Sequence, residues 1–283
     1  TTEIYTLSLH DALPIYKHCA AMRLRRTQLP SLDRLELLLP ASTTFEAAPG
    51  DDCRMEMDGG DGNALVFSGK ITQVRRSFSG LSIEAHNGGF ALARYRPAVA
   101  FEQQSVGDVI GNLCADADVE IASNVEGPVM ALYASDGRAT AAQEIARLAF
   151  MAGASGAFDE KGRLHVSEDG GPSGELALKY GREIMAGDAA NSLADESSVT
   201  VVGEGAGAPD SDQARWIVVD FLRGGGSEPG PDARRLIRPE LRTQEDAELA
   251  AAAFAQRRAA GESQVRLRTW LHQIGRASCR ERV

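Results

Sequence analysis

FEQQSVGDVIGNLCADADV (residues 101–119) and TAAQEIARLAFMAGASGAFDEKGRLHV (residues 140–166) are the two stretches of sequence that decide the fold. Both repeat apolar residues at the i, i+3, i+4 spacing of one helix face. Ser105 is the expected N-cap of the first helix, and Thr140 with Gln143 matches a capping box at the start of the second. The spacing therefore predicts two amphipathic helices in the middle of the chain.

The apolar positions predict which face of each helix is buried. The first buried face is expected to consist of Val106, Val109, Ile110, Leu113 and Cys114, and the second of Ile145, Leu148 and Ala149. Gly153 is expected to close the second helix in the left-handed conformation, which glycine adopts without steric cost.

A β-hairpin is predicted directly after the second helix. The DEKG turn at residues 159–162 reverses the chain, and Leu164 and Val166 then alternate with Arg163 and His165. This alternation is typical of a strand with one buried face.

Short segments with period-two alternation flank the helices on both sides. Before the helices these segments are residues 34–40, 53–58, 64–74 and 81–86. After the helices they are residues 175–180, 198–203, 215–221 and 265–271. In residues 81–86, the inward set is expected to be Leu81, Ile83 and Ala85, and the outward set Ser82, Glu84 and His86.

A late helix is predicted between the last two strand segments. Thr243 is its expected N-cap, and Gly261 its stop. Its apolar residues are expected to pack on a sheet, and they are Leu249, Ala250, Ala253 and Phe254.

The order of these segments predicts an α+β fold that is mainly β, in three parts. Residues 16–97 form the first β domain, residues 98–170 an α/β insertion with two helices and a hairpin, and residues 171–273 the second β domain. The strand spacing of the first domain suits a small barrel or sandwich.

Both ends of the chain resemble translated sequencing adapters. Residues 1–15, TTEIYTLSLHDALPI, and residues 274–283, IGRASCRERV, carry this resemblance. We expect both to be artefacts and exclude them from the fold. The first domain is then expected to be truncated at its N-terminus, and the second at its C-terminus.

Charge and composition exclude several classes of function. The net charge of -10 argues against stable nucleic-acid binding, which needs clustered Lys and Arg. No apolar run reaches the roughly 18 residues of a membrane helix, so no membrane contact is expected. Cys19, Cys53 and Cys114 are far apart and never in a CxxC pattern, so we expect them to be reduced, buried and inert.

One glycine pattern resembles a nucleotide-binding loop. Gly203, Gly205 and Gly207 follow a predicted strand. Pro209 and a polar stretch come next, in place of the helix whose N-terminus would receive a pyrophosphate. A plain loop is the better interpretation.

The other candidate sites also favour plain structural roles. DGGDGN at residues 58–63 lacks oxygen ligands at alternate positions, so a hairpin turn is expected instead of a calcium loop. Asp51 and Asp52 are expected in a solvated turn. The histidines His18, His86, His165 and His272 are isolated in the sequence, and His86 and His165 are expected to be solvated on strands. We therefore assign no catalytic, cofactor-binding or metal-binding residue, and expect no cofactor.

With these segments in place, the chain resembles the hub family that includes phage late control protein D and the first part of the VgrG spike proteins. The resemblance lies in VFSGKITQVRRSFSGLSIEAHNG, in FEQQSVGDVIGNLCADADV and in AAQEIARLAFMAGASGAFDEKGRLHV, with looser matches in SVTVVGEG and EDAELAAAAFAQRRA. Together these motifs cover most of residues 34–271.

The resemblance implies two tube-like β-barrel domains with the helical insertion between them. It implies a homotrimer whose ring joins the tail tube to the spike, located in the virion tail baseplate after synthesis in the bacterial host cytoplasm. The family implies no cofactor and no enzyme activity. The alternatives are the hub region of a type VI secretion or extracellular injection spike, and a tail-associated hydrolase, which would need paired carboxylates or a nucleophile with its base.

Overall fold

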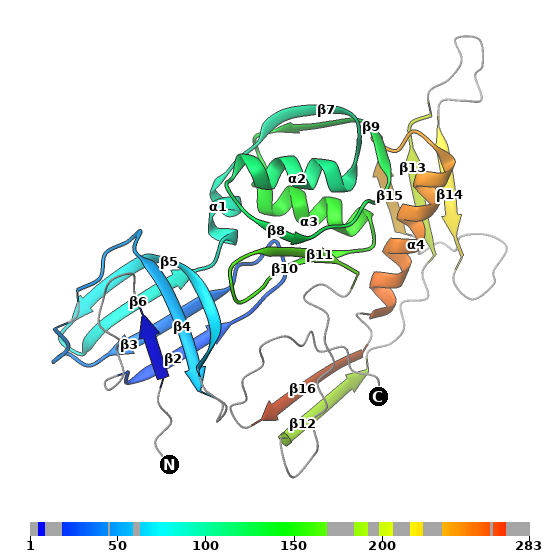
Figure 1. Cartoon of the computed structure of the whole chain (residues 1–283). Coiled ribbons are helices and arrows are strands. Elements are labelled where there is room, and N and C mark those ends of the chain that lie inside the picture. The colour runs from blue at the N-terminus through cyan, green and yellow to red at the C-terminus, as the bar shows by residue number, and fades with distance from the viewer. Residues whose placement is uncertain are drawn as a thin grey trace.

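The structure is a computed structural model of the whole chain. It describes residues 5–8, 19–44, 46–58, 63–168, 184–191, 198–205, 216–222, 234–260 and 263–269. A six-stranded sheet lies at one end, a helical middle part follows, and a three-stranded sheet with a long helix lies at the other end (Figure 1).

The first part is an antiparallel sheet with the strand order β1-β4-β5-β6-β3-β2. Its strands are β1 (Tyr5–Ser8), β2 (Ala21–Arg25), β3 (Arg34–Leu39), β4 (Asp52–Asp58), β5 (Asn63–Ser77) and β6 (Gly80–His86). The four strands predicted in this region are confirmed as β3 to β6. The inward set of β6 is also confirmed, because Leu81, Ile83 and Ala85 are buried while Ser82 is exposed.

The two edges of this sheet differ in character. β2 is the outer strand on one side, where exposed Arg23 and Arg25 alternate with half-buried Met22 and Leu24. β1 is the outer strand on the other side and falls inside residues 1–15. Its pairing with β4 does not test the origin of that segment, which stays a prediction.

The middle part contains the two predicted helices and the hairpin. Its elements are α1 (Gly89–Arg94), β7 (Ala98–Ser105), α2 (Val106–Asp116), β8 (Ile121–Ser123), β9 (Val129–Asp136), α3 (Ala141–Met151), β10 (Ser155–Phe158) and β11 (Leu164–Ser167). β7 and β9 form an antiparallel pair, and β11 lies between β10 and β8.

The helix caps and buried faces predicted for α2 and α3 are confirmed. Ser105 and Asp108 form a capping box on α2, and Thr140 and Gln143 form one on α3. Every residue of the two predicted faces is buried. Gly153 ends α3 with a φ of 73°, in the left-handed region.

The second β part contains two small sheets and the late helix. Its elements are β12 (Ile184–Asn191), β13 (Val199–Gly203), β14 (Ile217–Phe221), β15 (Arg234–Arg238), α4 (Gln244–Ala260) and β16 (Ser263–Thr269). β13 pairs antiparallel with β14 and parallel with β15, whereas β12 pairs with β16. The predicted strands near β13, β14 and β16 are confirmed, and the one at residues 175–180 lies outside the described residues.

The predicted buried face of α4 is partly wrong. Ala250 and Ala253 are buried as expected, but Leu249 is 48% exposed. The stripe that packs inward contains Ala247 and Ala251, and Leu249 lies on the opposite side of the helix from both. Small side chains are needed because the helix comes close to its neighbours: a Cβ at Gly153 would lie 3.1 Å from the Cβ of Ala253.

The hydrophobic core is divided into two clusters. One fills the first sheet between residues 35 and 85. The other runs without a break from the middle part into the second β part, and it also takes in Leu29 from the loop after β2. The middle and second parts therefore share one core.

The mainly β prediction is confirmed, whereas the two-barrel architecture stays a prediction. Among the described residues the six-stranded sheet is open, with β1 and β2 at its two ends. Within those same ranges, no helix is long and apolar enough to span a membrane.

Two glycines of α2 provide a matched test of this packing. A Cβ at Gly107 would lie 2.0 Å from the carbonyl oxygen of Val125, whereas one at Gly111 would meet nothing within 4 Å. We expect Gly107→Ala to lower the free energy of unfolding by about 1–3 kcal/mol through overpacking. Gly111→Ala should raise it by about 0.5–1 kcal/mol through helix propensity. Urea denaturation followed by circular dichroism measures both, and equal effects would contradict the described packing.

Candidate functional site

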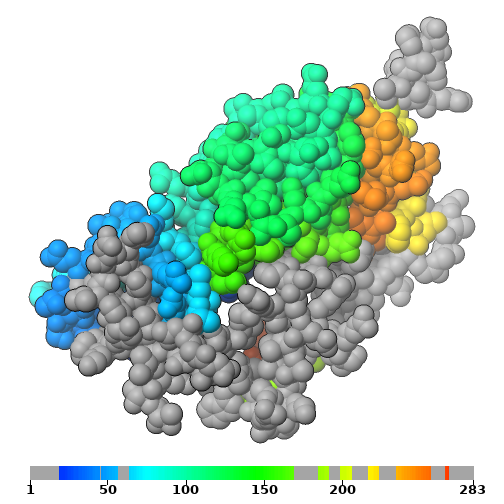
Figure 2. Space-filling view, viewed as in Figure 1, coloured from blue at the N-terminus to red at the C-terminus, as the bar shows by residue number. Residues whose placement is uncertain are grey.

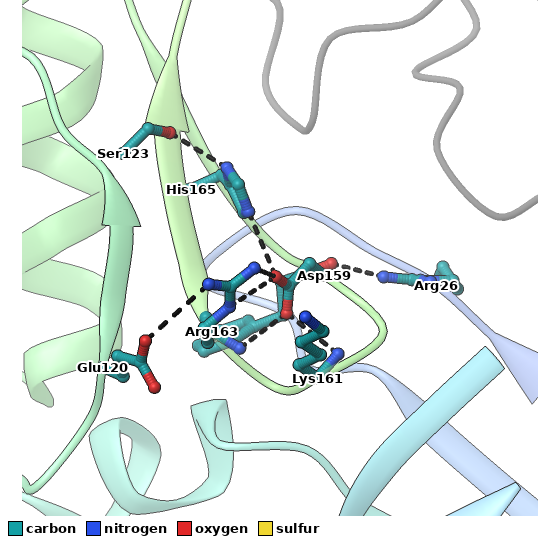
Figure 3. A network of polar contacts seen from close by, with 8 residues as sticks. Arg26, Glu120, Ser123, Asp159, Lys161, Arg163 and His165 are labelled. Carbon is teal, nitrogen blue, oxygen red and sulfur yellow. Dashed lines mark hydrogen bonds and ion pairs between the residues drawn. The ribbon is translucent and has the colours of Figure 1, made fainter. Parts of the chain in front are cut away.

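The most connected polar group of the middle part is Asp159, at the tip of the β10–β11 hairpin (Figure 3). Its Oδ1 accepts hydrogen bonds from the backbone N–H groups of Lys161 and Arg163, at 3.0 and 2.8 Å. Its Oδ2 accepts from the Arg163 guanidinium at 2.8 Å and lies 3.3 Å from His165 Nε2. The Asp159 side chain is only 3% exposed, so these partners replace its water.

These donors determine the charge state of Asp159. Burial alone raises the pKa of this carboxyl, but the hydrogen bonds from the Arg163 backbone, the Arg163 guanidinium and His165 outweigh it and hold the pKa below its ordinary value. Asp159 is therefore ionised in the folded protein at neutral pH.

His165 links this carboxylate to a serine. Its Nδ1 lies 3.0 Å from the Ser123 Oγ, so Asp159, His165 and Ser123 form a chain that joins the hairpin to β8 (Figure 3). The expectation that His165 is solvated was wrong, because its side chain is only 17% exposed. No local pattern predicted this contact, since Ser123 lies 42 residues from His165 in the chain.

His86 is also less solvated than expected. Its Nδ1 lies 2.9 Å from Thr72 Oγ1, and its ring stacks on Phe90. Burial lowers the pKa of His86, with smaller opposing and assisting effects from Glu84 and Arg34. This histidine therefore favours its neutral form.

An acid, a histidine and a serine in this order also occur in nucleophilic catalysis, where the carboxylate stabilises an imidazolium. Here the Arg163 guanidinium contacts the same oxygen, Oδ2, that faces His165, and at a shorter distance. The main counter-charge of Asp159 is thus Arg163. The arrangement is well suited to hold three strands together and poorly suited to activate Ser123.

The hairpin is also tied to the first sheet. Arg26, just after β2, donates a hydrogen bond to the carbonyl oxygen of Phe158 (Figure 3). The backbone N–H of Leu29 donates to Gly156 O at 2.7 Å. Arg26 Nε also lies 3.4 Å from buried Asp33. Burial raises the pKa of Asp33, although Thr27 and Arg26 partly offset this effect. The loop between β2 and β3 thereby fixes the first part on the middle part.

A second set of polar contacts, centred on Arg147, joins the middle part to the second β part. We call this set and the Asp159 network the two polar seams. Arg147 of α3 lies 3.0 Å from Glu144 and 2.9 Å from Glu240, which follows β15. Its guanidinium also lies over the ring of Tyr133, whose hydroxyl donates to Glu144 at 2.8 Å. A cavity of about 280 Å³ lies beside this cluster, and its lining includes Arg242.

The glycine-rich loop considered above has a packing role where the structure describes it. Gly203 is the last residue of β13, and a Cβ there would lie 2.5 Å from the carbonyl oxygen of Leu241. Gly207 and Pro209 lie outside the described residues. The close approach of Leu241 accounts for Gly203 without a bound phosphate.

The remaining candidates lie apart from one another. Asp58 pairs with Asn63 where β4 meets β5, as a hairpin turn requires, and residues 59–62 are outside the described ranges. Asp51 and Asp52 are exposed before and at the start of β4. His18 and His272 fall outside the described ranges. No group of three potential metal ligands occurs in the described part of the chain.

The structure describes three of the four cysteines; these three are free thiols, and two of them are buried. Cys53 and Cys114 are buried, and this burial raises the pKa of each to about 12. Such thiols resist ionisation, which agrees with the expected inert state. Cys19 is half-buried, and burial raises its pKa as well.

Comparison with known proteins shows where this fold occurs. No protein-family profile matches the chain, and no curated protein matches its sequence. Among solved structures, the 43 kDa tail protein of prophage MuSo2 from Shewanella oneidensis is similar over 98% of this chain and 86% of its own, with a TM-score of 0.68 and 16% identity.

Two further solved structures are similar to the chain. The tail protein from Neisseria meningitidis MC58 gives a TM-score of 0.65 and 13% identity, and covers 94% of this chain and 84% of its own. Prophage tail protein gp18 from Listeria monocytogenes EGD-e gives 0.51 and 7%, over 83% of this chain and 71% of its own. The chain therefore has a fold that is found in phage tail proteins.

The Asp159 network makes a prediction about stability. Asp159→Asn removes the charge partner of Arg163 in a buried site, and should lower the free energy of unfolding at pH 7 by about 1–3 kcal/mol. Because the folded-state pKa is lowered, the difference from the unchanged protein should shrink as the pH falls below about 4. Urea denaturation at several pH values measures this difference.

A matched control uses the same arginine. Glu120 lies 3.8 Å from Arg163 but is 70% exposed. Glu120→Gln should change stability by less than about 0.5 kcal/mol. An equal loss from both substitutions would show that burial of Asp159 is not what matters.

The serine provides a chemical test. A fluorophosphonate probe reacts with activated serine nucleophiles, and we expect it to leave this protein unlabelled because Arg163 shares the Asp159 charge. Mass spectrometry of the intact chain measures the labelling. Labelling that disappears in Ser123→Ala but persists in Ser82→Ala would instead support a hydrolase.

Proposed function

We propose that this chain is a structural hub component of a contractile phage tail baseplate, similar to late control protein D, that joins the tail tube to the spike as a ring. The observation that carries the proposal is the shared fold with the MuSo2 tail protein across 98% of the chain. The hub motifs between residues 66 and 166 support it independently, because they were read from the sequence alone.

The three-part arrangement fits a ring subunit. The six-stranded sheet and the sheet of β13, β14 and β15 lie at opposite ends of the molecule with the helical part between them, and the space-filling view shows the surfaces of the middle part and α4 running together (Figure 2). The contacts from Arg26 to Phe158 and from Arg147 to Glu240 tie each β part to the middle part. Three such copies would place six tube-like β domains in one ring.

The exposed apolar residues support assembly with other chains. Seven of the eleven large apolar side chains that are exposed in the described residues lie in the second β part, which is therefore the surface that most needs cover. These seven are Met185, Trp216, Val218, Phe221, Ile237, Leu249 and Leu267. We propose a homotrimer that contacts tail-tube and spike proteins in the virion tail baseplate, after synthesis in the host cytoplasm.

The proposed role needs neither catalysis nor stable nucleic-acid binding. The Ser123–His165–Asp159 chain acts as a tie between strands in this proposal, and its carboxylate charge is shared with Arg163. The net charge of -10 would repel a nucleic-acid backbone that passes through the ring.

The proposal predicts an oligomer in solution. We expect the chain to run as a homotrimer in size-exclusion chromatography with light scattering, because its exposed apolar surfaces are then covered. Negative-stain electron microscopy should show rings with threefold symmetry. A monomer that persists at high protein concentration would contradict the proposal.

A further inference from the structure

The tip of the β5–β6 hairpin presents a fully exposed phenylalanine. Phe78 has a relative exposure of 106% and occupies the turn between the two strands. The turn around it is held by polar contacts: Ser77 Oγ lies 2.8 Å from Ser79 Oγ and donates to Gly80 O at 3.2 Å. An apolar ring held out on a tied turn is typical of an anchor for another molecule.

The residues beside Phe78 make this anchor both apolar and basic. Leu38 is an exposed apolar residue, and a Cβ at Gly80 would lie 3.6 Å from its Cδ1. Arg75 and Arg76, both exposed, precede the tip on β5. We call Leu38, Arg75, Arg76 and Phe78 the hairpin anchor.

An apolar surface that could receive such an anchor lies on the sheet β14-β13-β15. Val202 of β13 is paired with Val218 of β14 on one side and with Ile237 of β15 on the other, so the three side chains form a row across one face. Val218 is 58% exposed and Ile237 is 62% exposed. Trp216, two residues before Val218 and also exposed, lies on the same side.

The opposite face of this sheet is already occupied. Val201 and Val219 point to that side and are buried in the core shared with α4. The row of Val202, Val218 and Ile237 lies on the other face, where Val218 and Ile237 are exposed, and we call this row together with Trp216 and Asp220 the acceptor face.

The charged residues of the acceptor face favour one orientation of a docked anchor. The next row across the sheet is Asp220, Thr200 and Arg235, from β14 to β15. The Asp220 carboxylate accepts a hydrogen bond from Thr200 at 2.5 Å and remains exposed. A basic anchor would thus place its arginines toward β14, where Asp220 lies, and away from Arg235 on β15.

We propose that the hairpin anchor of one copy of this chain docks on the acceptor face of the next copy. The inference rests on the proposed ring and names the surfaces that would build it. A second copy fits as the partner because it carries the matching apolar face with Asp220, and because the chain as a whole is acidic at a net charge of -10.

The placement of the two surfaces fixes the kind of assembly. The six-stranded sheet and the β14-β13-β15 sheet lie at opposite ends of the molecule, so the contact forms between copies (Figure 1). Two different surfaces of the same chain meet in it, which makes the contact head-to-tail. Such a contact closes into a ring when the rotation between neighbouring copies divides a full turn, and otherwise continues as a chain of subunits.

The experiment uses two substitutions that each remove one surface. Phe78→Ser removes the anchor, and Ile237→Ser weakens the acceptor face; both side chains are exposed, so the fold should persist, which circular dichroism checks. We expect each variant alone to run at the mass of one 30.1 kDa chain in size-exclusion chromatography with light scattering. Val129→Ser, at an exposed apolar residue of β9 in the middle part and outside both surfaces, should keep the mass of the unchanged protein.

Mixing the variants makes the test specific. A Phe78→Ser copy retains its acceptor face and an Ile237→Ser copy retains its anchor, so an equimolar mixture should form a complex of two chains that grows no further. If the unchanged protein assembles but both variants assemble equally well, or the mixture stays monomeric, the contact is overturned while the ring remains. A monomeric unchanged protein overturns both.

Discussion

The arrangement of this chain depends on the packing of helix α3 against both α2 and α4. One side of it packs on α2, and the other meets α4, where Phe150 and Phe254 contact edge to face at 5.0 Å. The sheet of β13, β14 and β15 obtains its core by extending the core of the middle part through α4. Its position is therefore set by the close approach between Gly153 and Ala253.

The two polar seams, around Asp159 and Arg147, fix the orientation of the packed elements. Apolar contact tolerates sliding, whereas Asp159 and Arg147 each need several partners at fixed positions. A buried charge that loses one partner loses much of its stabilisation, so each seam favours a single orientation of the parts it joins. The Asp159 network joins the hairpin to β8, the bonds from Arg26 and Leu29 join the hairpin to the first part, and Arg147 joins α3 to the turn after β15.

The sequence allowed the helices α2 and α3, their caps and the β10–β11 hairpin to be predicted, because these signals lie within a few residues of one another. The strands β7, β9 and β15 were not predicted, since they depend on partners far along the chain. The Ser123–His165 contact was missed for the same reason. Leu249 was expected to pack on a sheet with Ala250, Ala253 and Phe254, whereas the buried side of α4 is formed mainly by alanines and Leu249 is exposed. The two-barrel architecture had no local signal and stays a prediction.

The outer edge of strand β2 affects how a free subunit behaves before it assembles. In the proposed ring, a subunit would stay in solution until enough copies are present, and an open sheet edge is then a template for indiscriminate pairing with other chains. Exposed Arg23 and Arg25 along β2 place positive charge on that edge. Two such edges repel each other, so premature pairing between identical subunits is slowed while docking through other surfaces is not. The order of events during assembly is thereby favoured by electrostatics as well as by shape.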